Sequence, residues 1–244
     1  MATPLAAGSA TLVRQYFVQN RSVSDPTAAL IKAALINGAV DIGYGIPSNH
    51  SGWGRINLTN TMFPSSPRKI RFSDNATRFS TGGNWTATYK SNNTNVQLKF
   101  TLVWTDYPAA LSASTQLVND LNLLVTIPNG SIYIGNNFVA PYNSSLDTVN
   151  NVEQITITTP PTGDYLVNVS AKNIALGSGK QTFALVVSGA IDDAAPTISY
   201  AASSPPDNNE TLINFTLINI TISIIMLQSL QTATIPIKYL GMIL

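Results

Sequence analysis

A change in the period of the hydrophobic residues, at about residue 68, most constrains the fold of this 244-residue chain. Before that point, small and apolar residues recur every three to four positions, which is the period of an α-helix. After it, apolar and polar residues alternate over short segments, which is the period of a half-buried β-strand. We therefore expect a helical region followed by an all-β region.

Two helices are expected in residues 1–62. The first runs from the N-terminus to about Val18. The second begins with Asp25 as its N-cap and Pro26 in its first turn, and it ends at Gly38. Two helices without strands do not form a domain, so this region is expected to be the end of a larger one.

The alternation is clearest between Val96 and Trp104, and similar short segments follow it along the chain. Further strands are expected at Trp85–Lys90, Leu121–Ile127, Ser131–Ile134, Val152–Thr158, Tyr165–Ala171 and Thr182–Ser188. Asn129 and Gly130 form a hairpin turn signal between two of these segments. About eight short strands with no helix among them indicate an antiparallel β-sandwich or jelly roll.

Proline-rich segments mark the expected boundaries of the β region. Residues 63–67 are a predicted linker, and the β domain is predicted at 68–190. A second linker is predicted at 191–210, before a tail at 211–244 that is either an incomplete immunoglobulin-like segment or an aberrant end. A membrane span at 212–227 is the weaker alternative, because polar residues interrupt a run shorter than roughly 20 residues.

The composition excludes several classes of function. Lys and Arg number 13 against 12 Asp and Glu, which gives a net charge of +1, and charged residues are only 10% of the chain. A nucleic-acid partner is not expected, because such a protein needs a basic surplus. The absence of cysteine and the single histidine, His50, exclude disulfides, thiol catalysis and a multi-histidine metal site. No organic cofactor is expected.

Carboxylate and amide side chains fall at strand ends and loops of the predicted β domain. They are Asp106, Asn119, Asp120, Asn122, Asp147, Asn151 and Glu153. Hard oxygen ligands of this kind suit calcium, so one hypothesis is a structural calcium site. The alternative is ordinary turn chemistry, in which Asp and Asn accept hydrogen bonds from nearby backbone.

Several motifs resemble those of subtilisin-like serine proteases, in the order that the family carries them. The opening Met1-Ala2-Thr3-Pro4 resembles the second half of the family's Gly-Thr-Ser-Met-Ala-Thr-Pro signature. The end of the second helix, Asn37-Gly38-Ala39, and the segment Gly52-Trp53-Gly54 resemble later parts of the catalytic domain. The β region is similar to the C-terminal sandwich of a subgroup of alkaline subtilases, at residues 102–108, 117–123, 150–153, 163–165 and 181–189.

The resemblance implies a mixed fold, with the end of an α/β catalytic domain at 1–62 and the sandwich after it. It implies serine endopeptidase chemistry on a protein or peptide substrate, in a secreted or cell-surface parent protein. It also favours calcium, because the related sandwich domains bind it. Subtilases carry Asp, His and Ser in that order, so we expect all three before residue 1. Met1, Ala2, Thr3 and Pro4 would then stand next to the nucleophile.

No residue of this chain is therefore expected to be catalytic, and the chain alone is expected to be inactive and to lack a signal peptide. A substitute pair would need a base within hydrogen-bond reach of Ser9, and only His50 is available. We expect Ser9 to pack on a helix and His50 to lie solvated in a polar loop. The alternative function is a non-catalytic binding or adhesion module of a secreted or surface protein, since fold does not determine function.

Overall fold

The computed structural model describes residues 2–176, 180–192 and 197–200, all of which belong to the first of two units, 1–204 and 205–244. The predicted tail at 211–244 and the candidate span at 212–227 lie outside the described residues. The described residues form the following elements: α1 (Ala2–Asn20), α2 (Ala28–Gly38), α3 (Leu58–Met62), β1 (Lys69–Phe79), β2 (Asn84–Ser91), β3 (Leu98–Val103), β4 (Asn119–Thr126), β5 (Ile132–Ile134), β6 (Val152–Ile157), β7 (Gly163–Ile174), β8 (Gln181–Gly189) and β9 (Thr197–Tyr200). Within this part of the chain, no helix has both the length and the apolar content needed to cross a bilayer.

The start of α2 differs from the prediction, although both helices form where the period indicates. Its N-cap is Thr27, whose Oγ1 accepts from the backbone N–H of Leu30 at 3.1 Å, and not Asp25. The Asp74 carboxylate of β1 holds this cap, accepting from the Thr27 backbone N–H at 2.8 Å and from its hydroxyl at 2.6 Å. Asp25 instead pairs with Arg14 at 3.3 Å. A contact from a distant strand therefore selects the cap.

The described strands are antiparallel and form two sheets, in the orders β1-β8-β3-β6 and β5-β4-β7-β2-β9. The strands predicted from the sequence correspond to β2 through β8, with ends shifted by at most three residues. The predicted hairpin turn at Asn129 and Gly130 is confirmed, with Gly130 at a φ of 86° between β4 and β5. The prediction missed α3, β1 and β9, and β9 falls within the predicted linker at 191–210. The fold is thus mostly antiparallel β structure with a few helices.

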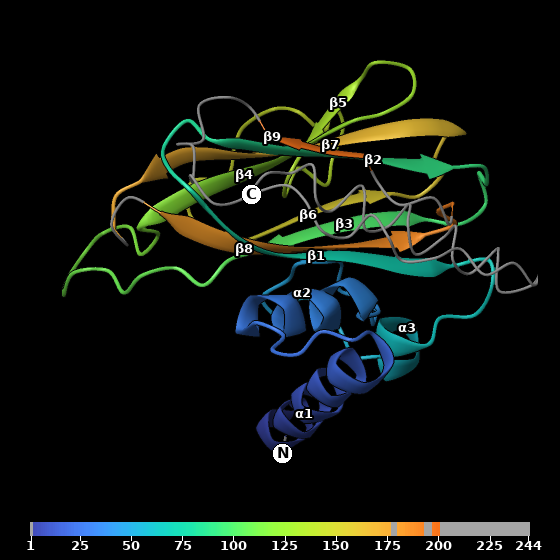
Figure 1. The fold of residues 1–244 in the computed structure, drawn as a ribbon, viewed down its shortest axis with the longest axis horizontal. Helices are drawn as coiled ribbons and strands as arrows, with labels where there is room; N and C mark the ends of the chain where they lie inside the picture. Colours follow the sequence, from blue (N-terminus) through green and yellow to red (C-terminus); the bar gives the residue numbers. More distant parts are fainter. Residues whose placement is uncertain (1, 177–179, 193–196, 201–244) are drawn as a thin grey trace, which may run out of the picture. The chain divides into compact units, whose positions relative to one another are not determined.

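One hydrophobic core lies between the two layers of strands (Figure 1). Its largest members include Trp85 of β2, Trp104 just after β3, and Tyr165 of β7, all at most 1% exposed. Residues of β4 and β7 enter it at alternate positions, as the strand period requires. The prediction that β3 is half-buried was wrong, because all six of its residues are buried.

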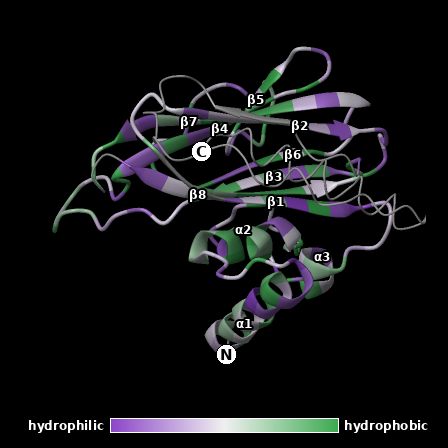
Figure 2. Cartoon of the chain, viewed as in Figure 1, coloured by the Kyte–Doolittle hydropathy of each residue, from purple (hydrophilic) through white to green (hydrophobic). Residues whose placement is uncertain are grey.

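The second face of β3 is buried because α2 covers the outer side of the β1-β8-β3-β6 sheet (Figure 1). Leu30 and Ala33 of α2 join Val103 of β3 and Val186 of β8 in a second hydrophobic cluster. α1 reaches the same cluster through Val13 and Phe17. Figure 2 shows hydrophobic residues along α2 and along the strands of both layers. The helical and β regions of the sequence therefore share a core.

A buried amide joins the end of α2 to this sheet. Asn37 is 3% exposed, and its Nδ2 lies 3.0 Å from Thr101 Oγ1 and 3.1 Å from the backbone oxygen of Val186. Leaving such a donor unpaired would cost about 1–3 kcal/mol. The pair of bonds thus allows the polar end of a helix to rest on an apolar sheet.

Gly38, the last residue of α2, provides a test of this close packing. A Cβ at this position would lie 2.2 Å from Thr61 Oγ1 and 2.9 Å from the backbone of Thr61 in α3. We expect Gly38→Ala to lower the free energy of unfolding by about 1–3 kcal/mol, as overpacking does. Gly8 in α1 has no atom within 4 Å of its Cβ position, so Gly8→Ala should instead stabilise by about 0.5–1 kcal/mol. Urea unfolding of both variants checks the prediction, and equal midpoints would contradict it.

Candidate functional site

The residues expected beside the nucleophile lie at the start of α1. Ala2, Thr3 and Pro4 form its first turn and are exposed, and Met1 lies outside the described residues. Because these three residues are exposed, a neighbouring segment could contact them.

We predict that Ser9 and His50 form no catalytic pair. Ser9 is half-buried on α1, while His50 is exposed in a loop and its ring lies 5.1 Å from that of Tyr44. Within the described residues, no hydrogen bond joins Ser9 to His50. That no catalytic pair forms here stays a prediction, since general-base catalysis needs His50 within hydrogen-bond reach of Ser9.

A group of carboxylate and amide side chains lies where β4 and β6 approach each other. Asp120 and Asn122 are two residues apart on β4, on the face opposite to the core residues Leu121 and Leu123. Glu153, near the start of β6, is completely buried, and its Oε2 accepts a hydrogen bond from the backbone N–H of Leu123 at 2.6 Å. The side chain of Glu153 thus connects strands of the two sheets.

Three oxygen atoms of this group are buried without a hydrogen-bond partner. They are Asp120 Oδ1, Asn122 Oδ1 and Glu153 Oε1. Gly135 packs closely on the Glu153 carboxylate, because a Cβ at Gly135 would fall 2.2 Å from Glu153 Oε2. A buried acceptor without a partner is costly and requires a physical explanation, such as an ion or a proton.

The carboxylates of the group perturb one another. Burial, followed by the charges of Asp147 and Asp120, raises the pKa of Glu153 well above its usual value, although the bond from Leu123 opposes this. Burial and the charge of Asp147 also raise the pKa of Asp120. Burial alone would raise the pKa of Asp147, but hydrogen bonds from Asn136, Asn150 and the backbone lower it. Negative charge is therefore unfavourable at Glu153 and Asp120 and is stabilised at Asp147.

The other predicted ligands make structural hydrogen bonds. Asp106 accepts from the backbone N–H groups of Tyr107, Val118 and Asn119 at 2.7–2.9 Å, so it joins the segment after β3 to the start of β4. The side chain of Asn119 links the end of β7 to the start of β8. Its Oδ1 accepts from the backbone N–H groups that follow β7, and its Nδ2 donates to Gln181 Oε1 at 2.7 Å. Asn151 donates to the backbone oxygen of Trp104 at 3.1 Å. In the described part of the chain, no three His, Asp or Glu side chains stand together as a metal centre, so any ion there would also need amide or backbone oxygens.

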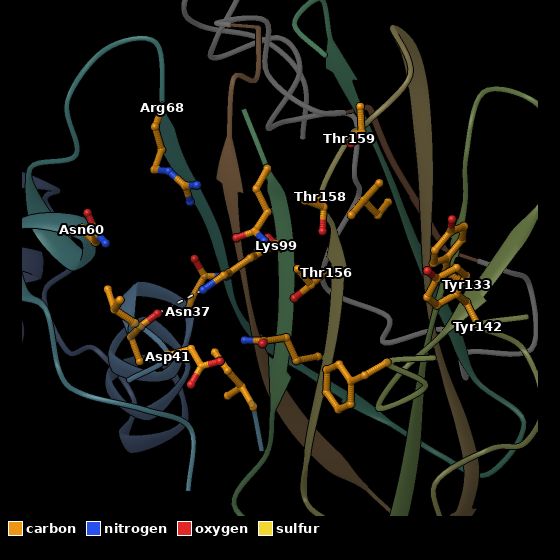
Figure 3. A pocket seen from close by; sticks show the side chains of 17 residues that line it. Asn37, Asp41, Asn60, Arg68, Lys99, Tyr133, Tyr142, Thr156, Thr158 and Thr159 are labelled. Atoms are coloured by element: carbon orange, nitrogen blue, oxygen red, sulfur yellow. Dashed lines mark hydrogen bonds between the residues drawn. The ribbon is translucent and has the colours of Figure 1, made fainter. Parts of the chain in front are cut away.

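A second feature, which the sequence analysis missed, is a cavity of about 880 Å³ on the outer face of the β1-β8-β3-β6 sheet (Figure 3). Its charged lining residues are Asp41, Arg68 and Lys99. They are separated in the sequence by loops and strands, and no motif marks them. The one available signal was Lys99, the charged residue of the alternating segment that forms β3.

No protein-family model matches this sequence. Three curated proteins of Dictyostelium discoideum are similar to it, and each is named a serine protease/ABC transporter B family protein. The protein tagA is 33% identical over 208 residues, which cover 76% of this chain and 12% of tagA. The protein tagB is 28% identical over 75% of this chain, and tagD is 27% identical over 78%.

This chain spans only 12 to 14% of the length of these relatives. The names relate it to proteins that contain a serine protease, and they say nothing of which residues react. The relationship agrees with the serine-protease part of the resemblance read from the sequence motifs.

The burial of Glu153 leads to a pH-dependent stability. Because its pKa is higher in the folded than in the unfolded protein, the folded state holds the proton over a range above about pH 4.5. The contribution of protonated Glu153 to the free energy of unfolding is complete below that range, and it is lost as the pH rises through the range. With a chelator present, we expect the urea midpoint to fall as the pH rises above about 4.5, and to fall less in Glu153→Gln, which keeps the acceptor for Leu123. Parallel pH curves for the two proteins would show that Glu153 ionises as freely when folded as when unfolded.

Proposed function

We propose that this chain is the C-terminal part of a subtilisin-like serine endopeptidase that is secreted or displayed at the cell surface. The observation that carries the proposal is the ordered series of subtilase-like motifs in a chain whose relatives are named serine protease/ABC transporter B family proteins. The nucleophilic Ser, the His and the Asp would then lie in a segment before residue 1. The substrate of the longer protein would be a protein or peptide.

The packing of the helices supports this proposal. α1 buries only Val13, Tyr16 and Phe17, and it leaves Leu5 73% exposed. A hollow of about 520 Å³ lies beside α1 and α2, lined mainly by apolar residues such as Ile31, Leu35 and Trp53. Exposed apolar surface of this kind suits packing against another part of a protein. In the proposal, the remainder of the catalytic domain covers it.

The glycines around Trp53 support the same assignment. Gly52 and Gly54 have φ angles of 55° and 97°, and a Cβ on Gly54 would lie 2.5 Å from the backbone oxygen of Val40. Arg55 exchanges backbone hydrogen bonds with Val40 at 2.8 and 3.0 Å. The glycine-aromatic-glycine segment is thus needed to return the chain to the end of α2 and to place Trp53 at the hollow.

We further propose that the two sheets form a β-sandwich appended to the catalytic domain, whose role is to stabilise it. The shared core of α2 and the outer face of the β1-β8-β3-β6 sheet supports this role, because it couples the stability of the two regions. The alternative, a binding or adhesion module without catalysis, is favoured only by the polar cavity beside Lys99.

Labelling with a fluorophosphonate probe tests the protease proposal. We expect the 244-residue chain to form no adduct and to hydrolyse no peptide, because Ser9 has no base within reach. A longer protein, expressed with the residues that the coding sequence upstream of Met1 encodes, should form a stoichiometric adduct on the serine just before Met1. An adduct on the 244-residue chain, or none on the longer protein, would contradict the proposal.

We also propose a structural calcium ion beside β4 and β6. Its ligands would be fewer than the residues predicted from the sequence. The unpartnered buried oxygens of Asp120, Asn122 and Glu153 support it, since they are hard donors that lack hydrogen bonds. Asp147 lies close enough to add its charge. A bound cation would offset the burial of these carboxylates. Asp106, Asn119 and Asn151 are left with their structural hydrogen bonds.

Thermal unfolding with calcium, with magnesium and with a chelator tests the calcium proposal. At about 100 times its Kd, calcium should add roughly 2.7 kcal/mol of stability and raise Tm by several degrees. Asp120→Asn and Glu153→Gln should reduce this gain, while Asp25→Asn, an exposed control on the helical side, should keep it. The same Tm in calcium and in chelator would refute the proposal.

A further inference from the structure

The cavity of about 880 Å³ lies against the outer face of β3 and β6, at the end of α2 (Figure 3). Lys99, the second residue of β3, projects into it from between Leu98 and Phe100, which point the opposite way into the core. Lys99 is only 8% exposed, and its Nζ donates to the backbone oxygen of Ala39 at 3.0 Å. Its ammonium group is thus held in place at the cavity wall.

A second cation stands beside Lys99. Ser188 of β8 and Thr156 of β6 are the cross-strand partners of Lys99, so their side chains share its face of the sheet. Arg68 Nη1 donates to Ser188 Oγ at 3.1 Å, which brings its guanidinium next to Lys99. Burial and then the charge of Arg68 lower the pKa of Lys99. The two cations therefore repel each other at close range.

No carboxylate of the described residues pairs with either cation. Asp41 lines the same cavity, but its carboxylate accepts from the backbone N–H groups of Gly43, Tyr44 and Gly45 at 2.9–3.1 Å. The Asp41 carboxylate is thus used within its own turn, and it does not compensate the positive charges of Lys99 and Arg68. Two partly buried positive charges without a negatively charged partner are unfavourable unless an anion joins them.

Neutral polar groups and aromatic rings complete the cavity. Gln154 donates through Nε2 to Thr101 Oγ1 at 2.9 Å, which fixes it in the wall. Tyr133 and Tyr142 stack with centroids 4.8 Å apart, and Figure 3 shows them across the cavity from Arg68 and Lys99. The wall thus has a cationic end and an aromatic end.

We propose that this cavity binds a small ligand through an oxyanion, a carboxylate, phosphate or sulfate group held between Lys99 and Arg68. Arg forms two-pronged hydrogen bonds with such groups, and Lys contributes a point charge. The space toward Tyr133 and Tyr142 accepts the body of the ligand. The inference does not depend on the protease proposal, because every residue that it uses belongs to the described chain.

A structural role for Lys99 is the rival explanation. Its Nζ bonds to Ala39 O just after the C-terminus of α2, where a cation also stabilises the helix dipole. Lys99→Met therefore tests stability as well as binding. Arg68→Met keeps the bond from Lys99 to Ala39 and separates the two effects.

Chemical-shift titration of the full 244-residue chain with inorganic phosphate, sulfate and glutarate, at constant ionic strength, tests the proposal. We expect saturable binding of at least one of them, with shifts at Gln154 and Thr156. Arg68→Met and Lys99→Met should weaken it about tenfold or more, as loss of a charged hydrogen bond does. Lys90→Met, which removes an exposed cation on β2, should bind as the wild type does.

The three probes distinguish the source of the group. Preference for glutarate indicates a carboxylate ligand, and preference for phosphate or sulfate indicates an ester of those acids. The proposal is overturned if none of the three binds saturably. It is also overturned if Arg68→Met binds as tightly as Lys90→Met, since Lys99 would then serve α2 alone.

Discussion

The packing of α2 on the outer face of the β1-β8-β3-β6 sheet is the contact on which the rest of the structure depends. It buries the second face of β3, and it places the end of the helix over buried strand backbone. An apolar sheet cannot accept a helix end unless the polar groups there find partners. Asn37 and Lys99 provide them, one from the helix to the sheet and one from the sheet to the helix end.

The same contact explains why a charged residue is buried in β3. Lys99 bonds to Ala39 at the end of α2, and its charge then needs compensation that no carboxylate of the described residues supplies. Glu153 presents the opposite problem on the neighbouring strand β6, where a buried carboxyl group has one oxygen without a hydrogen-bond partner. In our proposals, an oxyanion ligand joins Lys99 and Arg68, and a calcium ion joins the oxygen atoms around Glu153.

Much of the fold was predictable from the sequence because it depends on local patterns. Alternation placed β2 through β8 to within three residues, and the hairpin at Gly130 followed from its turn residues. The cap of α2 was not predictable, because Asp74 selects Thr27 from 47 residues away. The candidate sites were only partly predictable. Asp120, Asn122 and Glu153 belonged to a set chosen by residue type. The sequence could not separate them from Asp106 and Asn119, which accept from backbone N–H groups 12 and 56 residues away.

The sequence by itself determined the kinds of elements, the absence of cysteine chemistry and the motifs that relate this chain to serine proteases. These follow from composition and from neighbours a few positions apart, where periodicity and turn preference act. Only the tertiary structure decided which polar side chains are buried and which lack partners. Burial depends on strands brought together across the sheets, and the free energy of a charged group is set by that environment rather than by its own identity.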